Sequence, residues 1–264
     1  MILSRRVALG GTELDSVDER ILICGFEEDE PETSRSALNL YGGTGMGSWL
    51  SYENISCKKV TVKFNINANK RDYAGRNDVL EKVTAWAHPG GWLTSSTRPE
   101  RRILVRNSGR PKIADPRKMD TEYSLTFEAR EKPYWENVNV ASAVSGVSAN
   151  TSVRLSVDGN LKNALEVELL NKSGARINNA TITCGVNAMK FTNLALVANE
   201  ALVILYDDRN IQEVLIREAP NKYRHAAALR SGADDFIVEP GIAVAAFTAD
   251  RACTLTIRCA GRYA

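Results

Sequence analysis

The chain has 264 residues, of which 44% are hydrophobic and 25% are charged. This length predicts two domains, each with enough apolar residues for its own core, and the composition excludes a disordered protein. Its 34 basic and 32 acidic residues leave a net charge of +2, too small to hold nucleic acid by charge alone.

Membrane, secreted and disulfide-rich proteins are also disfavoured. No run of about 18 apolar residues is present. The start, MILSRRVALGG, lacks the continuous apolar core of a secretion signal, so we expect folding in the cytoplasm of the cell that makes the protein. The cysteines are odd in number and scattered, which favours buried thiols over disulfides or a metal site. They are Cys24, Cys57, Cys184, Cys253 and Cys259.

The first half alternates apolar and polar residues, as half-buried antiparallel strands do. The alternation is clear in residues 58–68, 102–106 and 121–130. The residues expected on the buried faces are Val60, Val62, Phe64, Ile66, Ile103, Val105, Tyr123, Leu125, Phe127 and Ala129.

Residues 78–88 break this alternation and predict one amphipathic helix on a sheet. Apolar residues recur there at three- and four-residue spacing. Asp78 and Glu81 fit a capping box, His88 suits the negative end of the helix dipole, and residues 89–91 (PGG) end the helix.

Three other segments are expected to connect the packed elements. Residues 25–37 are rich in acidic groups and predict a solvated loop, whereas the glycine-rich residues 41–54 predict a mobile loop or an extended hairpin arm. Residues 137–152 are small and polar, which indicates an interdomain connection or a first edge strand beyond it.

The second half predicts an antiparallel β-sandwich. It contains about eight short apolar segments with turn residues between them and no convincing helix; residues 226–235 are long enough for a short helical turn only. The expected strands lie in residues 152–157, 165–171, 181–185, 201–206, 211–218, 236–241, 243–247 and 254–259.

No catalytic, cofactor-binding or metal-binding residues are expected. His88 and His225 are the only histidines, neither lies in a metal-binding motif, and no GxSxG motif is present. The acidic pairs at 207–208 and 234–235 favour turns over a calcium site. The glycine-rich 41–54 segment lacks a phosphate-binding pattern, and the basic residues 69–76 favour a solvated turn over a nucleic-acid contact.

Two alternatives to a structural protein stay open. A carbohydrate-binding module would present an aromatic platform on the second half, but all four tryptophans lie in the first half. A glycosidase would need two carboxylates at a fixed separation, and nothing in the sequence selects such a pair.

Several segments together resemble one family. In the first half these are KVTVKFNIN, VLEKVTAWAHPGGWL, ILVRNSG and PYWE; in the second half they are INNATITC, RSGADDFIVEPG, FTADRACTLTI and the closing GRY. In this order they are similar to the distal tail protein (Dit) of bacteriophages with long, non-contractile tails, over nearly the whole chain.

The resemblance implies a mainly β protein of two domains. Residues 1–138 would form a β-sandwich with a helix and a projecting hairpin, and residues 139–264 a galectin-like β-sandwich. Six copies would close into a ring at the tail tip of the virion, between the tail tube protein and the tail-tip hub or tail-associated protein.

The resemblance also implies further roles. A receptor-binding or fibre protein is a possible further partner, and DNA would pass through the ring without specific binding. The protein would be assembled in the host bacterial cytoplasm and support host attachment. Within the ring, residues 42–56 would reach the adjacent subunit, with Met46, Trp49 and Tyr52 as hypothesised contact residues.

Overall fold

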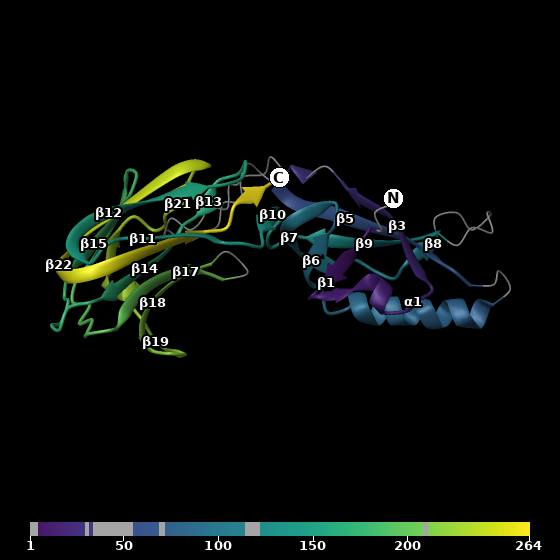
Figure 1. The fold of residues 1–264 in the computed structure, drawn as a ribbon, viewed down its shortest axis with the longest axis horizontal. Coiled ribbons are helices and arrows are strands. Elements are labelled where there is room, and N and C mark those ends of the chain that lie inside the picture. The colour runs from purple at the N-terminus through teal and green to yellow at the C-terminus, as the bar shows by residue number, and fades with distance from the viewer. Residues whose placement is uncertain (1–4, 30–31, 34–54, 69–71, 114–121, 208–210) are drawn as a thin grey trace. The chain divides into compact units, whose positions relative to one another are not determined.

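The computed structural model describes residues 5–29, 32–33, 55–68, 72–113, 122–207 and 211–264. They form a mainly β protein with a single α-helix, as predicted (Figure 1). Neighbouring strands along the main path of each large sheet pair antiparallel. The described residues divide into two compact units, one ending at Val138 and the other running from Asn139 to Tyr263. No described helix is long and apolar enough to cross a membrane.

The first unit is built on a sheet in the order β2-β1-β6-β7-β9-β5-β3. The ten residues predicted on buried faces are all at most 4% exposed. Across β5 and β9, Val62 lies opposite Leu125, and the rings of Phe64 and Tyr123 stack at 5.7 Å. The strands are β1 (Val7–Leu9), β2 (Thr12–Glu13), β3 (Ile21–Glu28), β4 (Glu32–Thr33), β5 (Ile55–Ile66), β6 (Gly91–Ser95), β7 (Arg98–Asn107), β8 (Lys112–Ile113), β9 (Glu122–Ala129) and β10 (Trp135–Asn137).

The helix α1 (Tyr73–Ala87) begins five residues before the predicted start. Asp72 caps it, because its carboxylate accepts a hydrogen bond from the backbone N–H of Gly75 at 2.8 Å. The predicted capping box at Asp78 and Glu81 is therefore wrong, and Asp78 pairs instead with Lys82 one turn later at 2.9 Å. The first turn, YAGRN, was missed because it has no apolar periodicity. The C-terminal end at His88 is confirmed.

The predicted acidic loop at residues 25–37 is partly wrong. Gly25–Glu28 belong to β3, whose pairing with β5 continues to Glu28 opposite Val60. A short 3-10 helix, Leu14–Ser16, precedes that strand.

In the predicted connection at 137–152, β11 (Ala141–Val144) and the start of β12 (Ser148–Val157) form, which agrees with the strand alternative.

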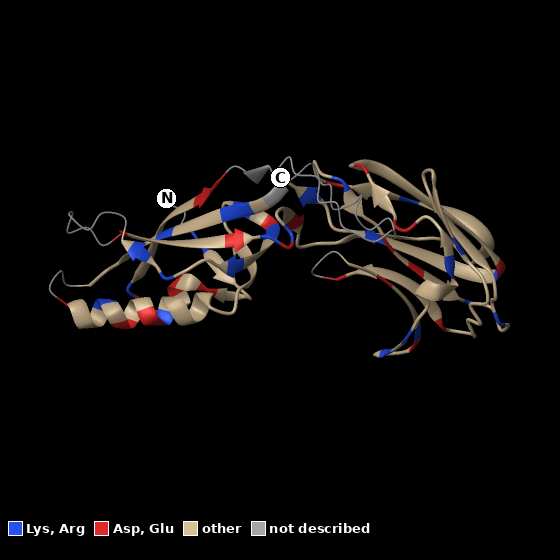
Figure 2. Cartoon of the chain, turned by 180° about the vertical axis from the view of Figure 1, so that it is seen from behind, with Lys and Arg blue, Asp and Glu red and all other residues tan. Residues whose placement is uncertain are grey.

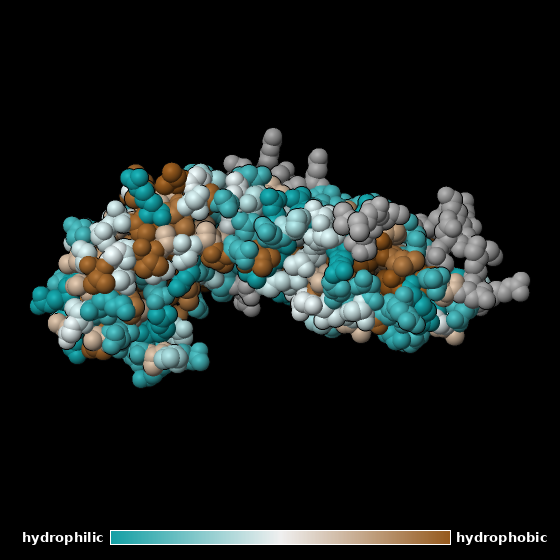
Figure 3. Space-filling model, in the orientation of Figure 1, coloured by the Kyte–Doolittle hydropathy of each residue, from teal (hydrophilic) through white to brown (hydrophobic). Residues whose placement is uncertain are grey.

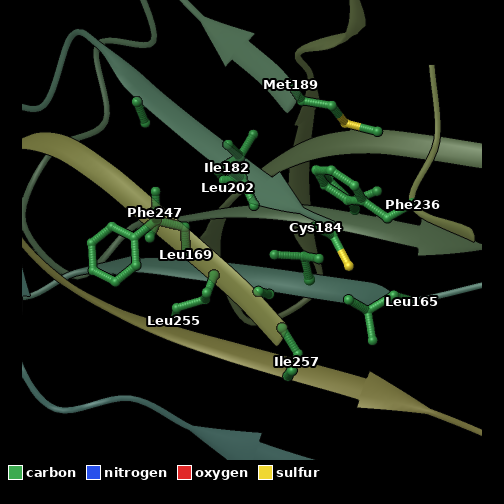
Figure 4. Packing of buried hydrophobic residues seen from close by; sticks show 14 of the residues in the cluster. Leu165, Leu169, Ile182, Cys184, Met189, Leu202, Phe236, Phe247, Leu255 and Ile257 are labelled. Carbon is green, nitrogen blue, oxygen red and sulfur yellow. The ribbon is translucent and has the colours of Figure 1, made fainter. Parts of the chain in front are cut away.

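The second unit is one curled sheet that encloses a single core. Its order is β19-β18-β17-β14-β22-β15-β16-β20, with β11 and β12 also paired to β22. Leu169, Ile182, Phe247 and Leu255 point into the core from three strands of this sheet (Figure 4). The remaining strands are β13 (Asn163–Ala164), β14 (Glu166–Asn171), β15 (Ala180–Cys184), β16 (Asn187–Phe191), β17 (Ala201–Tyr206), β18 (Gln212–Ala219), β19 (Lys222–His225), β20 (Arg230–Gly232), β21 (Ile237–Val238), β22 (Gly241–Cys259) and β23 (Arg262–Tyr263).

The 19-residue strand β22 connects the two halves of the curled sheet. Its first half pairs with β12 and β15, and its second half pairs with β14 and β11. The prediction of two separate strands at 243–247 and 254–259 is wrong, because the polar residues between them continue the strand. The short helical turn expected after His225 is a 3-10 helix, Ala227–Leu229, followed directly by β20.

Candidate functional site

The residues hypothesised to contact a neighbouring subunit, Met46, Trp49 and Tyr52, lie outside the described residues. Of the 42–56 segment, only Ile55 and Ser56 are described, and they begin β5. The contact predicted for this segment therefore stays a prediction.

The residues with catalytic or metal-binding potential are dispersed. Among the described residues, no group of three or more His, Cys, Asp and Glu side chains could hold a metal ion. Both histidines are exposed. Asp207 accepts a hydrogen bond from the N–H of Ile211 at 2.7 Å, and Asp234 pairs with Arg230 at 3.1 Å. The acidic residues thus hold turns, as the sequence indicated, and Asp208 lies outside the described residues.

The five cysteines form no disulfide. Cys57, Cys184, Cys253 and Cys259 are buried as expected, and burial raises the pKa of Cys253 to about 11. Cys24 is exposed, so the prediction is wrong for this residue.

A partly buried charge cluster around Glu28 joins four strands of the first unit, β3, β5, β7 and β10. The Glu28 carboxylate accepts hydrogen bonds from Arg98 and from the indole N–H of Trp135, the latter at 2.9 Å, and Lys58 Nζ lies 3.2 Å from it. The guanidinium of Arg98 also lies over the Trp135 ring, 5.4 Å from its centroid. Lys58 and Trp135 are buried. These contacts make the cluster a crosslink within the sheet.

A second charge cluster, around Glu168, lies on the outer face of the second unit. Arg217 Nη2 and Arg258 Nη2 donate to its two carboxylate oxygens at 2.5 and 3.1 Å. Glu168 lies on β14, Arg217 on β18 and Arg258 on β22. The arginine side chains are about one-third exposed. Tyr223 on β19 lies opposite Arg217 in the strand register and is also exposed. This face therefore presents polar donors beside an aromatic ring.

Exposed apolar side chains gather on the second unit, whose surface shows several hydrophobic patches (Figure 3). Val186 is 100% exposed and Ile242 is 74% exposed. Together with Val244 they border a groove of about 390 Å³ at the beginning of β22. Another groove, of about 540 Å³, follows α1 in the first unit and is lined by mixed polar and apolar groups, including Glu81, His88 and Arg110.

Sequence reasoning missed both clusters and the groove. The clusters join residues far apart in the chain, such as Glu28 and Trp135, and no local pattern marks them. A signal for the groove is present in GIAVAAF, where residues of both parities are apolar, so one face of the strand must be left exposed or covered by a partner. Charged residues of both signs are interspersed over the strands and helix (Figure 2).

No protein-family model and no curated protein matches the chain. Among solved structures, the chain is similar to the Dit protein of phage SPP1, which belongs to the hub of the adsorption apparatus in phages that infect Gram-positive bacteria. The TM-score is 0.68 at 11% identity, over 98% of this chain and 99% of the other. Baseplate chains of phage P2 in the activated conformation, with calcium and with strontium, give TM-scores of 0.45 and 0.42. Identities are 9% and 10%, over 97% and 96% of this chain and 98% and 97% of the others. The chain thus has the fold of the SPP1 Dit protein along nearly its whole length.

Proposed function

We propose that this protein is a non-enzymatic structural component of a phage tail tip, located in the virion. The observation that carries the proposal is the fold shared with the SPP1 Dit protein over 98% of the chain. One fold can host many functions, so a shared fold alone is a weak argument for a shared function. Here the fold agrees over both units and in their order along the chain, which narrows the range of functions.

In this proposal the first unit forms a ring of six copies and the second, galectin-like unit lies on its outside. The ring joins the tail tube protein to the tail-tip hub or tail-associated protein, and the second unit supports a receptor-binding or fibre protein. A ring requires two different surfaces of each copy to meet under closed cyclic symmetry. Assembly would take place in the host bacterial cytoplasm, and DNA would pass through without specific binding.

The mass of the purified protein by light scattering, with negative-stain imaging of the main peak, tests the ring. We expect particles of about six times the 29.0 kDa chain with a central hole. The measurement is repeated with the hub protein added, so that a ring that closes only on that partner is also detected. A monomer under both conditions would contradict the proposal.

A carbohydrate-binding role is the second candidate. The outer face around Glu168 supports it, because exposed guanidinium groups donate hydrogen bonds to sugar hydroxyls and a tyrosine ring packs on sugar C–H groups. Tyr223 and Arg217 supply both kinds of contact on adjacent strands. A glycan array tests this role: binding that is lost in Tyr223→Ala supports it, and an array without hits contradicts it.

A further inference from the structure

Strand β22 has an open edge at its beginning. On one side it pairs with β12 from Gly241 to Thr248. On the other side, its pairing with β15 begins only at Ala245, opposite Cys184. No described strand therefore pairs with Gly241–Val244 on that second side. In a strand, every second residue directs both its N–H and its C=O to the same side. Along roughly 13 Å of this edge, backbone donors and acceptors therefore have no strand partner.

The open edge exists because β15 turns back before β22 begins. Cys184 and Asn187 are the last and first residues of β15 and β16, and they form the final pair of this hairpin. Gly185 between them has φ +59°, a left-handed conformation that glycine adopts without strain. The groove of about 390 Å³ occupies the space beyond this turn, in line with β15.

The lining of the groove combines apolar side chains with polar groups and one negative charge. Val186, Ile242 and Val244 are exposed beside it, and Ile237, Val238 and Pro240 line its other parts. Glu239 is the only charged residue among the described lining residues. It pairs with Lys162 at 3.2 Å, but both side chains are more than half exposed, so this ion pair is weak and exchangeable.

We propose that this groove binds an extended segment of another protein, which adds a strand to the sheet beside Gly241–Val244. A strand is the occupant that satisfies the open backbone groups, and alternating apolar side chains of that strand would cover Ile242 and Val244. A basic residue of the segment would meet Glu239. A groove of this volume holds roughly three residues of one strand and is too small for the edge of a second sheet. The inference concerns the second unit alone and does not depend on ring formation.

The first test uses the full chain and a blocked octapeptide of alternating valine and threonine with a lysine at each end. We expect saturable binding in a calorimetric titration, with slower hydrogen exchange at the outward amides of residues 241–244. A matched peptide, N-methylated on the amides of one edge, keeps the side chains but cannot pair as a strand. We expect its affinity to fall at least tenfold.

The second test replaces one side chain of the groove. Ile242→Asn removes the apolar contact at an exposed position and is expected to weaken peptide binding about fivefold or more. Val144→Asn, at an exposed apolar position on β11 away from the groove, is the matched control and should leave the affinity unchanged.

Four results would each overturn the proposal. They are no binding at millimolar peptide, equal affinity for the N-methylated peptide, protection of amides elsewhere instead of at 241–244, and equal loss in Ile242→Asn and Val144→Asn. Light scattering of the Ile242→Asn variant without peptide tests whether the groove is filled by a second copy of this chain instead. A changed mass relative to the wild type would mean that a second copy of this chain fills the groove.

Discussion

Each unit contains a glutamate that binds two cationic side chains across neighbouring strands, but the two clusters differ in their access to water. Around Glu28, Lys58 and Trp135 are buried, and Arg98 keeps about one-third of its side chain exposed. Around Glu168, both arginines keep about one-third of their side chains exposed. The first cluster therefore contains a buried cation, Lys58, whereas both cations of the second cluster reach the surface and only its glutamate is buried.

The difference has an electrostatic consequence. Burial alone raises the pKa of Glu28, but the hydrogen bonds from Arg98 and Trp135 and the charge of Lys58 outweigh it, so the pKa is lowered. For Glu168, burial likewise raises the pKa, and the hydrogen bonds and charges of Arg217 and Arg258 lower it further than burial raises it. Burial lowers the pKa of Lys58, and Glu28 offsets only part of this effect. Lys58 thus needs its glutamate, whereas the arginines in the second unit can also bind water.

The largest expected effect is the loss of Glu28. Glu28→Ala leaves the buried ammonium of Lys58 and the indole N–H of Trp135 without this acceptor, and we expect the free energy of unfolding of the first unit to fall by about 3–5 kcal/mol. Tryptophan fluorescence during guanidinium unfolding measures it, because residues 139–264 contain no tryptophan.

The matched control for that experiment is Glu27→Ala. Glu27 pairs with Lys63 at 2.5 Å but is more than half exposed, so its loss should cost less than about 1 kcal/mol. Equal losses in the two variants would show that burial does not distinguish them.

A smaller effect is expected at the Glu168 cluster. Glu168→Ala removes two charge-assisted hydrogen bonds, but the freed arginines can turn to solvent, so we expect a loss of about 1–3 kcal/mol in the second unit. Hydrogen exchange of peptides from residues 139–264 measures it. Glu213→Ala, an exposed change on β18, should stay within about 0.5 kcal/mol. A loss as large as that of Glu28→Ala would remove the contrast between the clusters.

Acid should weaken both units through these two glutamates. Because the folded-state pKa of Glu28 lies below the ordinary value of 4.5, its contribution is complete above about pH 4.5 and is lost as the pH falls through the lowered pKa. Glu28→Gln should therefore show a shallower loss of stability in acid than the wild type in the fluorescence transition. Glu27→Gln is the control, and an unchanged slope in Glu28→Gln would contradict the assignment.

The smallest effect concerns a surface turn of the second unit. Ala195 has φ +52°, and Arg224 Nη2 holds the turn by donating to the carbonyl of Leu194 at 3.1 Å. Glycine adopts this conformation without the steric cost of a Cβ atom, so Ala195→Gly should stabilise the second unit by about 1 kcal/mol. Ala219→Gly, in a strand of the same unit, should destabilise it instead; a gain in both variants would refute the backbone explanation.

The sequence predicted those parts of the fold in which one face of a strand is buried. The alternation around Val60 and Leu125 located β5 and β9, because a half-buried sheet imposes a two-residue period. The start of α1 was missed, because the cap at Asp72 precedes a polar and glycine-containing first turn. β22 was divided in two, because the polar residues around Asp250 look like a turn.

The candidate sites were beyond sequence reasoning for a different reason. Glu28 and Arg98 are 70 residues apart, and Glu168 and Arg258 are 90 apart. Their contacts depend on the strand order, which no periodicity encodes. The open edge of β22 likewise follows from where β15 ends relative to β22, and that is a property of the register.

The position of β22 late in the chain also determines when the second unit can fold during synthesis. Strand β12 ends at Val157, and its partner residues begin only at Gly241. A ribosome adds about 5–20 residues per second, so each nascent chain carries an unpaired β12 for on the order of ten seconds. Neighbouring nascent chains on one messenger can exchange strands in that interval, so we expect the translation rate between residues 157 and 259 to affect the yield of correctly folded protein.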